Sequence, residues 1–222
     1  MAVEGVRRAR RVAAAAALLV AFAGGAQAQP AAAPPQAAMC MACHGPQGNS
    51  QIPTTPSLAG QPKLFIENQL VLIREGLRVV PEMKGMLDGL KDAELVALAG
   101  YFAAQKPVAA ATGAPNDATY ARGQALSARM LCGTCHLPDY SGREQIPRLA
   151  GQHEAFLLQA MKQFRDHPGP GRDTIMAASL YGLKDNDWPT WRTSSRISGS
   201  SPPYNDGLAA VVQWIERAPP KR

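Results

Sequence analysis

The chain has 222 residues and a formal net charge of +6 at pH 7, from 23 Lys or Arg and 17 Asp or Glu. The first 28 residues hold four of the arginines and one glutamate, so the rest of the chain carries 19 basic and 16 acidic residues, a formal charge of +3. So small an excess gives no reason to expect nucleic acid or an anionic membrane surface as a partner. The length allows one large domain or two small ones.

The first residues have the pattern of a secretory signal peptide. Four arginines between residues 7 and 11 precede the apolar run from Val12 to Ala23, and Ala26-Gln27-Ala28 is a small-x-small cleavage site. The alternative is a retained anchor helix, but an apolar helix of about 18 Å is too short for a bilayer core of about 30 Å. The sequence therefore predicts a signal peptide over residues 1–28, cleavage after Ala28, export, and no membrane span in the mature chain.

One pentapeptide pattern occurs twice, as Cys40-Met41-Ala42-Cys43-His44 and as Cys132-Gly133-Thr134-Cys135-His136. Two thiols three positions apart can add to the two vinyl groups of a haem, and the adjacent histidine then lies beneath the iron. A single copy could also be half of a zinc site or a redox dithiol. Both copies lie in matching surroundings and together use all 4 cysteines, which leaves none for a disulfide. The motifs therefore predict two covalently bound haem c groups.

The segments after the two motifs repeat each other. Pro56-Ser57-Leu58-Ala59-Gly60-Gln61 returns as Pro147-Arg148-Leu149-Ala150-Gly151-Gln152. Pro62 is expected to open a helix that is closed by Gly76, and the stretch from His153 to Arg165 is expected to repeat it.

A third block also repeats. Met83 lies seven residues before Leu90 in Gly89-Leu90-Lys91-Asp92, and Met176 lies seven before Leu183 in Gly182-Leu183-Lys184-Asp185. Asp92 is expected to cap a helix that ends at Lys106. Its apolar face holds Leu95, Leu98, Ala99 and Phe102.

Each repeat reads as a small helical unit. The first domain is predicted over residues 29–106, and residues 107–116, which are rich in Ala and Pro, are predicted to be a linker. The second domain is predicted over residues 117–222, and a helix from Asp117 to Leu131 is expected to lead into its motif. Domains of this size bury little apolar surface, so each is expected to depend on its haem.

The iron ligands are predicted from the same register. His44 and His136 are the proximal ligands, and a thioether in the sixth position would favour the reduced iron. Met83 and Met176 hold equal places in the repeat, whereas Met86 has no counterpart, so Met83 is preferred to Met86. The alternative is that both methionines only fill gaps in a core.

Each proximal histidine needs a hydrogen-bond acceptor for its Nδ1. The carbonyls of Pro56 and Pro147 are the predicted acceptors. His153 and His167 are expected to have surface or capping roles and not to bind iron.

These three paired blocks resemble the two-domain, two-haem class I cytochromes c, and most closely the cytochrome c4 family, over about residues 39–187. The resemblance implies an all-α fold of two tandem small cytochrome c-like domains, each around a covalently bound haem c with His/Met ligation. It also implies a periplasmic carrier that delivers electrons toward a terminal oxidase. The propionate edges of the two haems would then face each other between the domains.

The closing helix of the second domain departs from the family pattern. In the second domain, the repeat positions equivalent to Leu95, Leu98 and Phe102 are occupied by Trp188, Trp191 and Ser195. Residues 190–222 are therefore treated as an atypical tail. Two alternatives are open for this tail: a displaced closing helix that begins at Asp206, and a slip of the reading frame near Asp187.

The leading hypothesis is a single-electron carrier without substrate chemistry. The predicted partners are redox proteins, with a membrane quinol-oxidising complex or a dehydrogenase as donor and a terminal oxidase as acceptor. Two alternatives remain open: a two-haem peroxidase, which needs an open iron position, and a fixed electron-transfer subunit of a dehydrogenase or oxidase complex. Asp173 is the acid near Met176 that a peroxidase could use.

Overall fold

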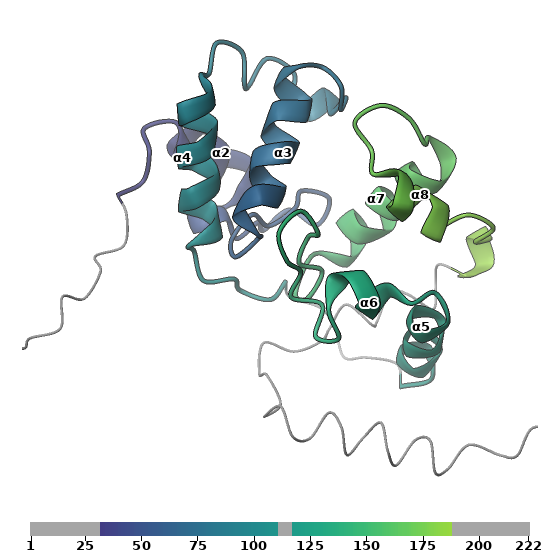
Figure 1. Ribbon diagram of the computed structural model, residues 1–222. Helices are drawn as coiled ribbons and strands as arrows, with labels where there is room; N and C mark the ends of the chain where they lie inside the picture. Colours follow the sequence, from purple (N-terminus) through teal and green to yellow (C-terminus); the bar gives the residue numbers. More distant parts are fainter. Residues whose placement is uncertain (1–31, 111–116, 188–222) are drawn as a thin grey trace, which may run out of the picture. The chain divides into compact units, whose positions relative to one another are not determined.

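The computed structural model describes residues 32–110, called the first half below, and residues 117–187, called the second half (Figure 1). Both belong to one compact unit of the chain. Within these residues the secondary structure is helical, apart from an isolated bridge between Arg143 and Ile146. The predicted all-α fold is therefore confirmed. The predicted signal peptide and the tail beyond Asp187, with its expected helix at Asp206, lie outside the described residues.

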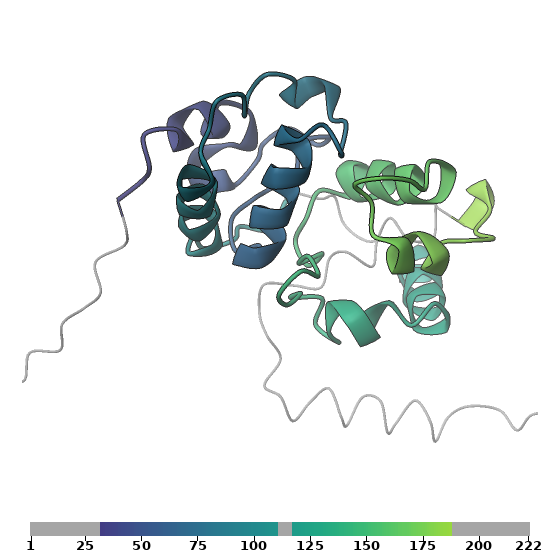
Figure 2. The ribbon, with the colours of Figure 1, turned by 45° about the horizontal axis from the view of Figure 1, so that its top comes forward.

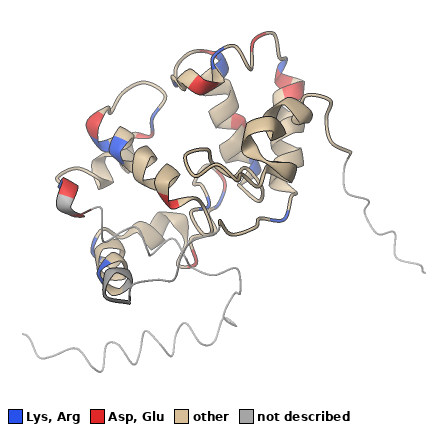
Figure 3. Ribbon diagram, turned by 180° about the vertical axis from the view of Figure 1, so that it is seen from behind, with Lys and Arg blue, Asp and Glu red and all other residues tan. Residues whose placement is uncertain are grey.

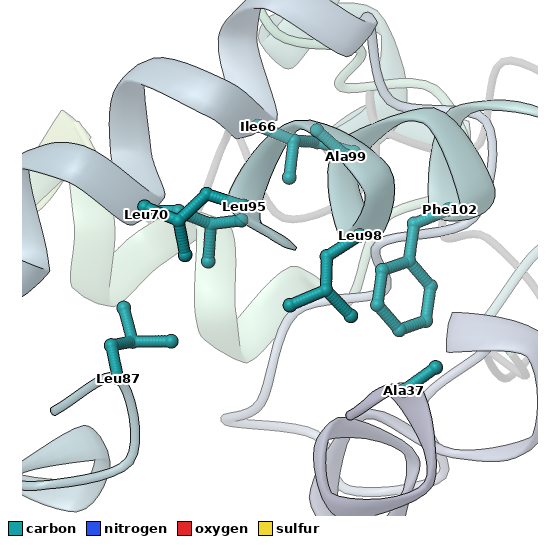
Figure 4. Close-up of a cluster of buried hydrophobic side chains, with 8 residues drawn as sticks. All are labelled: Ala37, Ile66, Leu70, Leu87, Leu95, Leu98, Ala99 and Phe102. Carbon is teal, nitrogen blue, oxygen red and sulfur yellow. The ribbon is translucent and has the colours of Figure 1, made fainter. Parts of the chain in front are cut away.

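The first half contains α2 (Ala37–His44), η1 (Pro46–Gly48), α3 (Lys63–Arg74), η2 (Pro81–Met83) and α4 (Asp92–Ala103). Helices α3 and α4 pack side by side (Figures 1 and 2). Their facing apolar side chains form the core with residues from α2 and from the loop before α4, shown in Figure 4: Ala37, Ile66, Leu70, Leu87, Leu95, Leu98, Ala99 and Phe102. The predicted apolar face of α4 is thus the buried face.

The second half contains α5 (Asp117–Arg129), α6 (Cys132–His136), α7 (Glu154–Asp166), α8 (Thr174–Ser179) and η3 (Asp185–Asp187). Its described core is smaller and consists of Leu157, Met161 and Leu180. The second-half positions that correspond to the core residues of α4 come after residue 187, outside the described residues. None of the helices described in either half has the length and apolar character needed to cross a bilayer.

The helix starts agree with the sequence except at α4. Pro62 is the N-cap of α3, and Gly76 follows α3 with φ +68°, the left-handed conformation that ends helices. Asp92 was expected to cap α4, but α4 begins at Asp92 and the cap residue is Lys91. The Asp92 carboxylate instead lies 2.8 Å from the Arg74 guanidinium. That ion pair holds the carboxylate away from the backbone N–H groups that a capping side chain would accept from.

His153 also differs from its prediction. It is the N-cap residue of α7, yet its side chain makes no capping hydrogen bond. The ring is buried, and its Nε2 lies 2.9 Å from the Ser50 carbonyl oxygen. A surface or capping role is therefore wrong for His153, because a backbone carbonyl distant in sequence is its partner. His167 follows α7 as an exposed residue, as predicted.

The turn after each motif uses left-handed backbone. Gly45 has φ +77° in the first half, and Leu137, at the same place in the second half, has φ +69° and ψ 157°. That region is populated almost only by glycine, because a Cβ crowds the neighbouring peptide groups. Leu137 therefore carries backbone strain that Gly45 avoids.

We predict that Leu137→Gly stabilises the protein. Removal of the strain should raise the free energy of unfolding by about 1 kcal/mol, because the Leu137 side chain is only half-buried and little packing is lost. Urea unfolding of the full chain measures the change. Gly45→Ala is the matched control and should destabilise, since its Cβ would clash with the Asn49 carbonyl oxygen. A lower midpoint for Leu137→Gly would contradict the prediction.

Candidate functional site

Each motif histidine ends a helix that also carries its two cysteines. His44 is the last residue of α2 and His136 is the last residue of α6, and both are buried. Nδ1 of His44 lies 2.8 Å from the carbonyl oxygen of Pro56, and Nδ1 of His136 lies 2.9 Å from that of Pro147. A carbonyl can only accept, so Nδ1 carries the proton. Nε2 is then the nitrogen that can bind iron.

Burial also sets the charge of these rings. It lowers the pKa of His44 and of His136, and the hydrogen bond to each proline carbonyl offsets part of that shift. Both imidazoles are therefore neutral at pH 7. The neutral ring is the form that binds a metal ion.

The proline carbonyls are held by an equivalent turn in each half. The carbonyl oxygen of Gly48 accepts from the backbone N–H groups of Leu58 and Ala59. The carbonyl oxygen of Tyr140 accepts in the same way from Leu149 and Ala150. In each half, these two hydrogen bonds bend the chain back over the motif histidine. The proline carbonyl oxygen thereby comes within hydrogen-bond distance of Nδ1.

The cysteines are unpaired, and in each half one is half-buried and one exposed. Burial raises the pKa of the Cys40 and Cys132 thiols, whereas a reactive dithiol depends on a lowered thiol pKa. The raised pKa of these two thiols argues against a reactive dithiol in either motif. Across residues 32–110 and 117–187, no group of three or more His, Cys, Asp or Glu side chains is placed to hold a metal ion.

The predicted methionines occupy equal places against the two cores. Met83 packs against the first-half core and Met176 against the second-half core. Met86 is half-buried and is not among the residues packed against that core. This difference favours Met83 over Met86.

The same repeat positions line both cores. These half-buried residues are Cys40, Leu58, Phe65, Ile73, Met83 and Leu90 in the first half, and Cys132, Leu149, Phe156, Phe164, Met176 and Leu183 in the second. A half-covered apolar wall with a cysteine and a methionine is a suitable surface for a flat apolar macrocycle. The residues present therefore fit a haem c in each half.

Two arginines that the sequence analysis missed hold the segments after the methionines. Nη1 of Arg74, on α3, donates to the carbonyl oxygen of Leu90 at 3.0 Å and lies 2.8 Å from the carboxylate of Asp92. Arg165, on α7, repeats both contacts with Leu183 at 3.0 Å and Asp185 at 2.9 Å. Each Gly-Leu-Lys-Asp segment is thereby tied to the preceding helix.

The sequence did contain a signal for these arginines. Arg74-Glu75 and Arg165-Asp166 are basic-acidic pairs at the same place in the repeat, and each arginine also contacts its acidic neighbour. Asp173 has a structural role as well. It is the N-cap of α8, and its carboxylate accepts from the Met176 backbone N–H at 2.7 Å.

In the comparison with protein families, the family described as Cytochrome C oxidase, cbb3-type, subunit III matches residues 28–102.

Curated relatives match most of the chain. The chain is 34% identical to cytochrome c4 of Azotobacter vinelandii over 169 residues, which is 68% of this chain and 80% of the relative. It is 36% identical to cytochrome c4 of Pseudomonas aeruginosa over 193 residues, 84% of this chain and 87% of the relative. It is also 37% identical to the thiosulfate dehydrogenase electron acceptor of Thiomonas intermedia over 198 residues, 85% of this chain and 82% of the relative.

Solved structures agree. The reduced recombinant cytochrome c4 from Pseudomonas stutzeri matches with a TM-score of 0.66 and 32% identity, covering 72% of this chain and 94% of that one. The cytochrome c4 of Acidithiobacillus ferrooxidans matches with a TM-score of 0.62 and 27% identity, covering 72% of this chain and 99% of that one.

We predict that Arg165→Met loosens the segment after Met176. The variant removes the contacts with Leu183, Asp185 and Asp166, so amide hydrogen exchange over residues 176–187 should become faster. Exchange over residues 83–92 should not change. Arg74→Met is the reciprocal control and should reverse the pattern. Unchanged exchange in both variants would show that the arginines do not hold these segments.

Proposed function

Because this chain belongs to the cytochrome c4 family of two-haem electron-transfer cytochromes, we propose that it carries single electrons between redox proteins through one haem c in each half. The observation that carries the proposal is the placing of Met83 and Met176 at equal positions on the two apolar walls. Two equivalent His/Met pairs leave neither iron open for substrate, as expected for a carrier.

The chain supplies attachment and ligands. Cys40 and Cys43 hold the first haem and Cys132 and Cys135 the second. When bound, each haem supplies a one-electron ferric/ferrous couple. His44 and His136 would bind the iron through Nε2, because Nδ1–H donates a hydrogen bond to the carbonyl oxygen of Pro56 or Pro147. Met83 and Met176 would supply the second iron ligand in each half, and a thioether ligand would favour the reduced state and raise the potential.

Asp173 supports a carrier over a peroxidase. A peroxidase needs a distal acid-base group free to move a proton. The Asp173 carboxylate instead accepts from the Met176 backbone and caps α8, so it helps to hold the proposed ligand. The chain is therefore proposed to be a carrier and not an enzyme.

The partners are proposed to be other redox proteins. A dehydrogenase or a membrane quinol-oxidising complex is the proposed donor and a terminal oxidase the acceptor. The relative named as a thiosulfate dehydrogenase electron acceptor supports a dehydrogenase as one donor. Basic and acidic positions are interspersed along the described ribbon in Figure 3. Encounters between redox proteins are expected to be brief and to use small contact areas. No nucleic acid is expected as a partner.

The proposed location is the periplasm, reached through the signal peptide over residues 1–28. The proposed domains are residues 29–106 and 117–222, with residues 107–116 as the linker. Attachment of two haems through paired thiols agrees with export.

We predict that Met83→Ala and Met176→Ala each remove about half of the sulfur-to-iron absorption band at the red end of the oxidised spectrum, and lower one potential. Met86→Ala is the control and should change neither. Spectroscopy and redox titration of the purified two-haem protein measure both effects. If Met86→Ala removes the band and Met83→Ala does not, the first-half ligand is Met86.

Reaction with peroxide separates carrier from enzyme. Stopped-flow mixing should show slow peroxide turnover and fast electron exchange with a small cytochrome or copper protein. Asp173→Ala should not lower this slow turnover, because Asp173 is assigned no proton-transfer role. Rapid turnover in the native protein that is lost in Asp173→Ala would favour a peroxidase.

A further inference from the structure

Two glutamine side chains join the halves reciprocally. Gln61 donates from Nε2 to the Arg148 carbonyl oxygen at 2.9 Å, and its Oε1 accepts from the Arg148 backbone N–H at 2.9 Å. Gln152 makes the same pair of bonds to Ser57, at 2.9 Å to the carbonyl oxygen and 2.8 Å from the N–H. We call these four bonds the glutamine clamp. All four residues are buried.

The clamp fixes the residues next to the proline carbonyls. Ser57 follows Pro56 and Arg148 follows Pro147, whose carbonyls accept from the two proximal histidines. Each half thus locks the backbone beside the histidine support of the other. In these four bonds the two halves are equivalent.

The side chains break that symmetry. The Ser57 Oγ accepts a hydrogen bond from the backbone N–H of Ser50 at 3.1 Å, so this hydroxyl has a hydrogen-bond partner in its own half. Arg148 is only 7% exposed, and its guanidinium donates to the carbonyl oxygens of Ala59, at 2.9 Å, and Ala150. The junction therefore holds one buried cation, on the second-half side.

The guanidinium of Arg148 is incompletely compensated by the residues described. Its Nε is buried without a hydrogen-bond partner there, and no carboxylate among the described side chains of residues 32–110 and 121–187 is within ion-pair distance. Burial lowers its pKa to about 10, so it is still charged at pH 7. A buried charge that meets only carbonyl dipoles is costly, and an arginine in that position is normally matched by an anion.

We propose that Arg148 is the counter-ion of a haem propionate at the junction of the halves and that it raises the potential of the haem whose propionate it binds. The proposal rests on the two-haem carrier function above. Haem c carries two carboxylates, and a planar guanidinium binds a carboxylate well. A fixed positive charge disfavours the more positive ferric iron. Since Ser57 offers no such charge, Arg148 gives the two haems different potentials.

Redox titration of the purified two-haem protein followed by its absorption spectrum tests this. In Arg148→Met, the midpoint potential of one haem should fall. At the native midpoint of that haem, the ratio of reduced to oxidised haem should be about tenfold lower, which corresponds to a fall of about 59 mV for a one-electron couple. Arg148→Lys keeps the charge and should restore most of the ratio. Arg143→Met removes an equal charge from an exposed place in the same segment and should leave both midpoints unchanged.

A second measurement covers the case in which Arg148→Met folds poorly. Arg148→Lys should shift the propionate bending band in the resonance Raman spectrum, because the hydrogen-bond donor changes, while Arg143→Met should not. Unchanged midpoints in Arg148→Met, or an unchanged Raman band in Arg148→Lys, would overturn the inference. The carrier function would survive that result if Met83→Ala and Met176→Ala behave as expected, and loss of those effects would overturn the carrier function instead.

Discussion

The hydrogen bond from each motif histidine to a proline carbonyl is the contact on which the rest of each half depends. At 2.8 Å and 2.9 Å, it fixes which ring nitrogen faces a metal. The chain must return over the histidine within 12 residues in one half and 11 in the other. That requirement explains the left-handed turns at Gly45 and Leu137. It also explains why the turn is kept in the second half although leucine suits it poorly.

The segment that follows each methionine is held by a different kind of contact. Arg74 and Arg165 tie the segment after each methionine to a helix through a carbonyl oxygen and a carboxylate. Each histidine is therefore held by a backbone carbonyl, and the segment after each methionine is held by an arginine side chain. A carrier benefits when neither ligand has to move as the charge on the metal changes.

The sequence predicted the helices, their repeat and the residues next to the proposed haems, because these follow from local patterns and fixed spacing. It missed contacts between distant segments. The partners of Gln61 and Gln152 lie 87 and 95 residues away, and the partner of His153 lies 103 residues away. Asp92 was assigned to a cap because its position fits that role, yet Arg74 binds its carboxylate. Which of two possible partners a side chain binds depends on the folded structure and cannot be read from local sequence.

The reciprocal form of the glutamine clamp has an evolutionary meaning. Each half gives one amide and receives one, so the contact is isologous, the type found in two-fold symmetric dimers. Two separate copies of a single ancestral half could have made the same four bonds. Joining them in one chain would raise their effective concentration and leave the bonds unchanged. After fusion, one copy could change a residue while the other copy kept it. The identical subunits of a homodimer cannot differ in this way. Ser57 and Arg148 occupy the same place in the repeat and are such a difference.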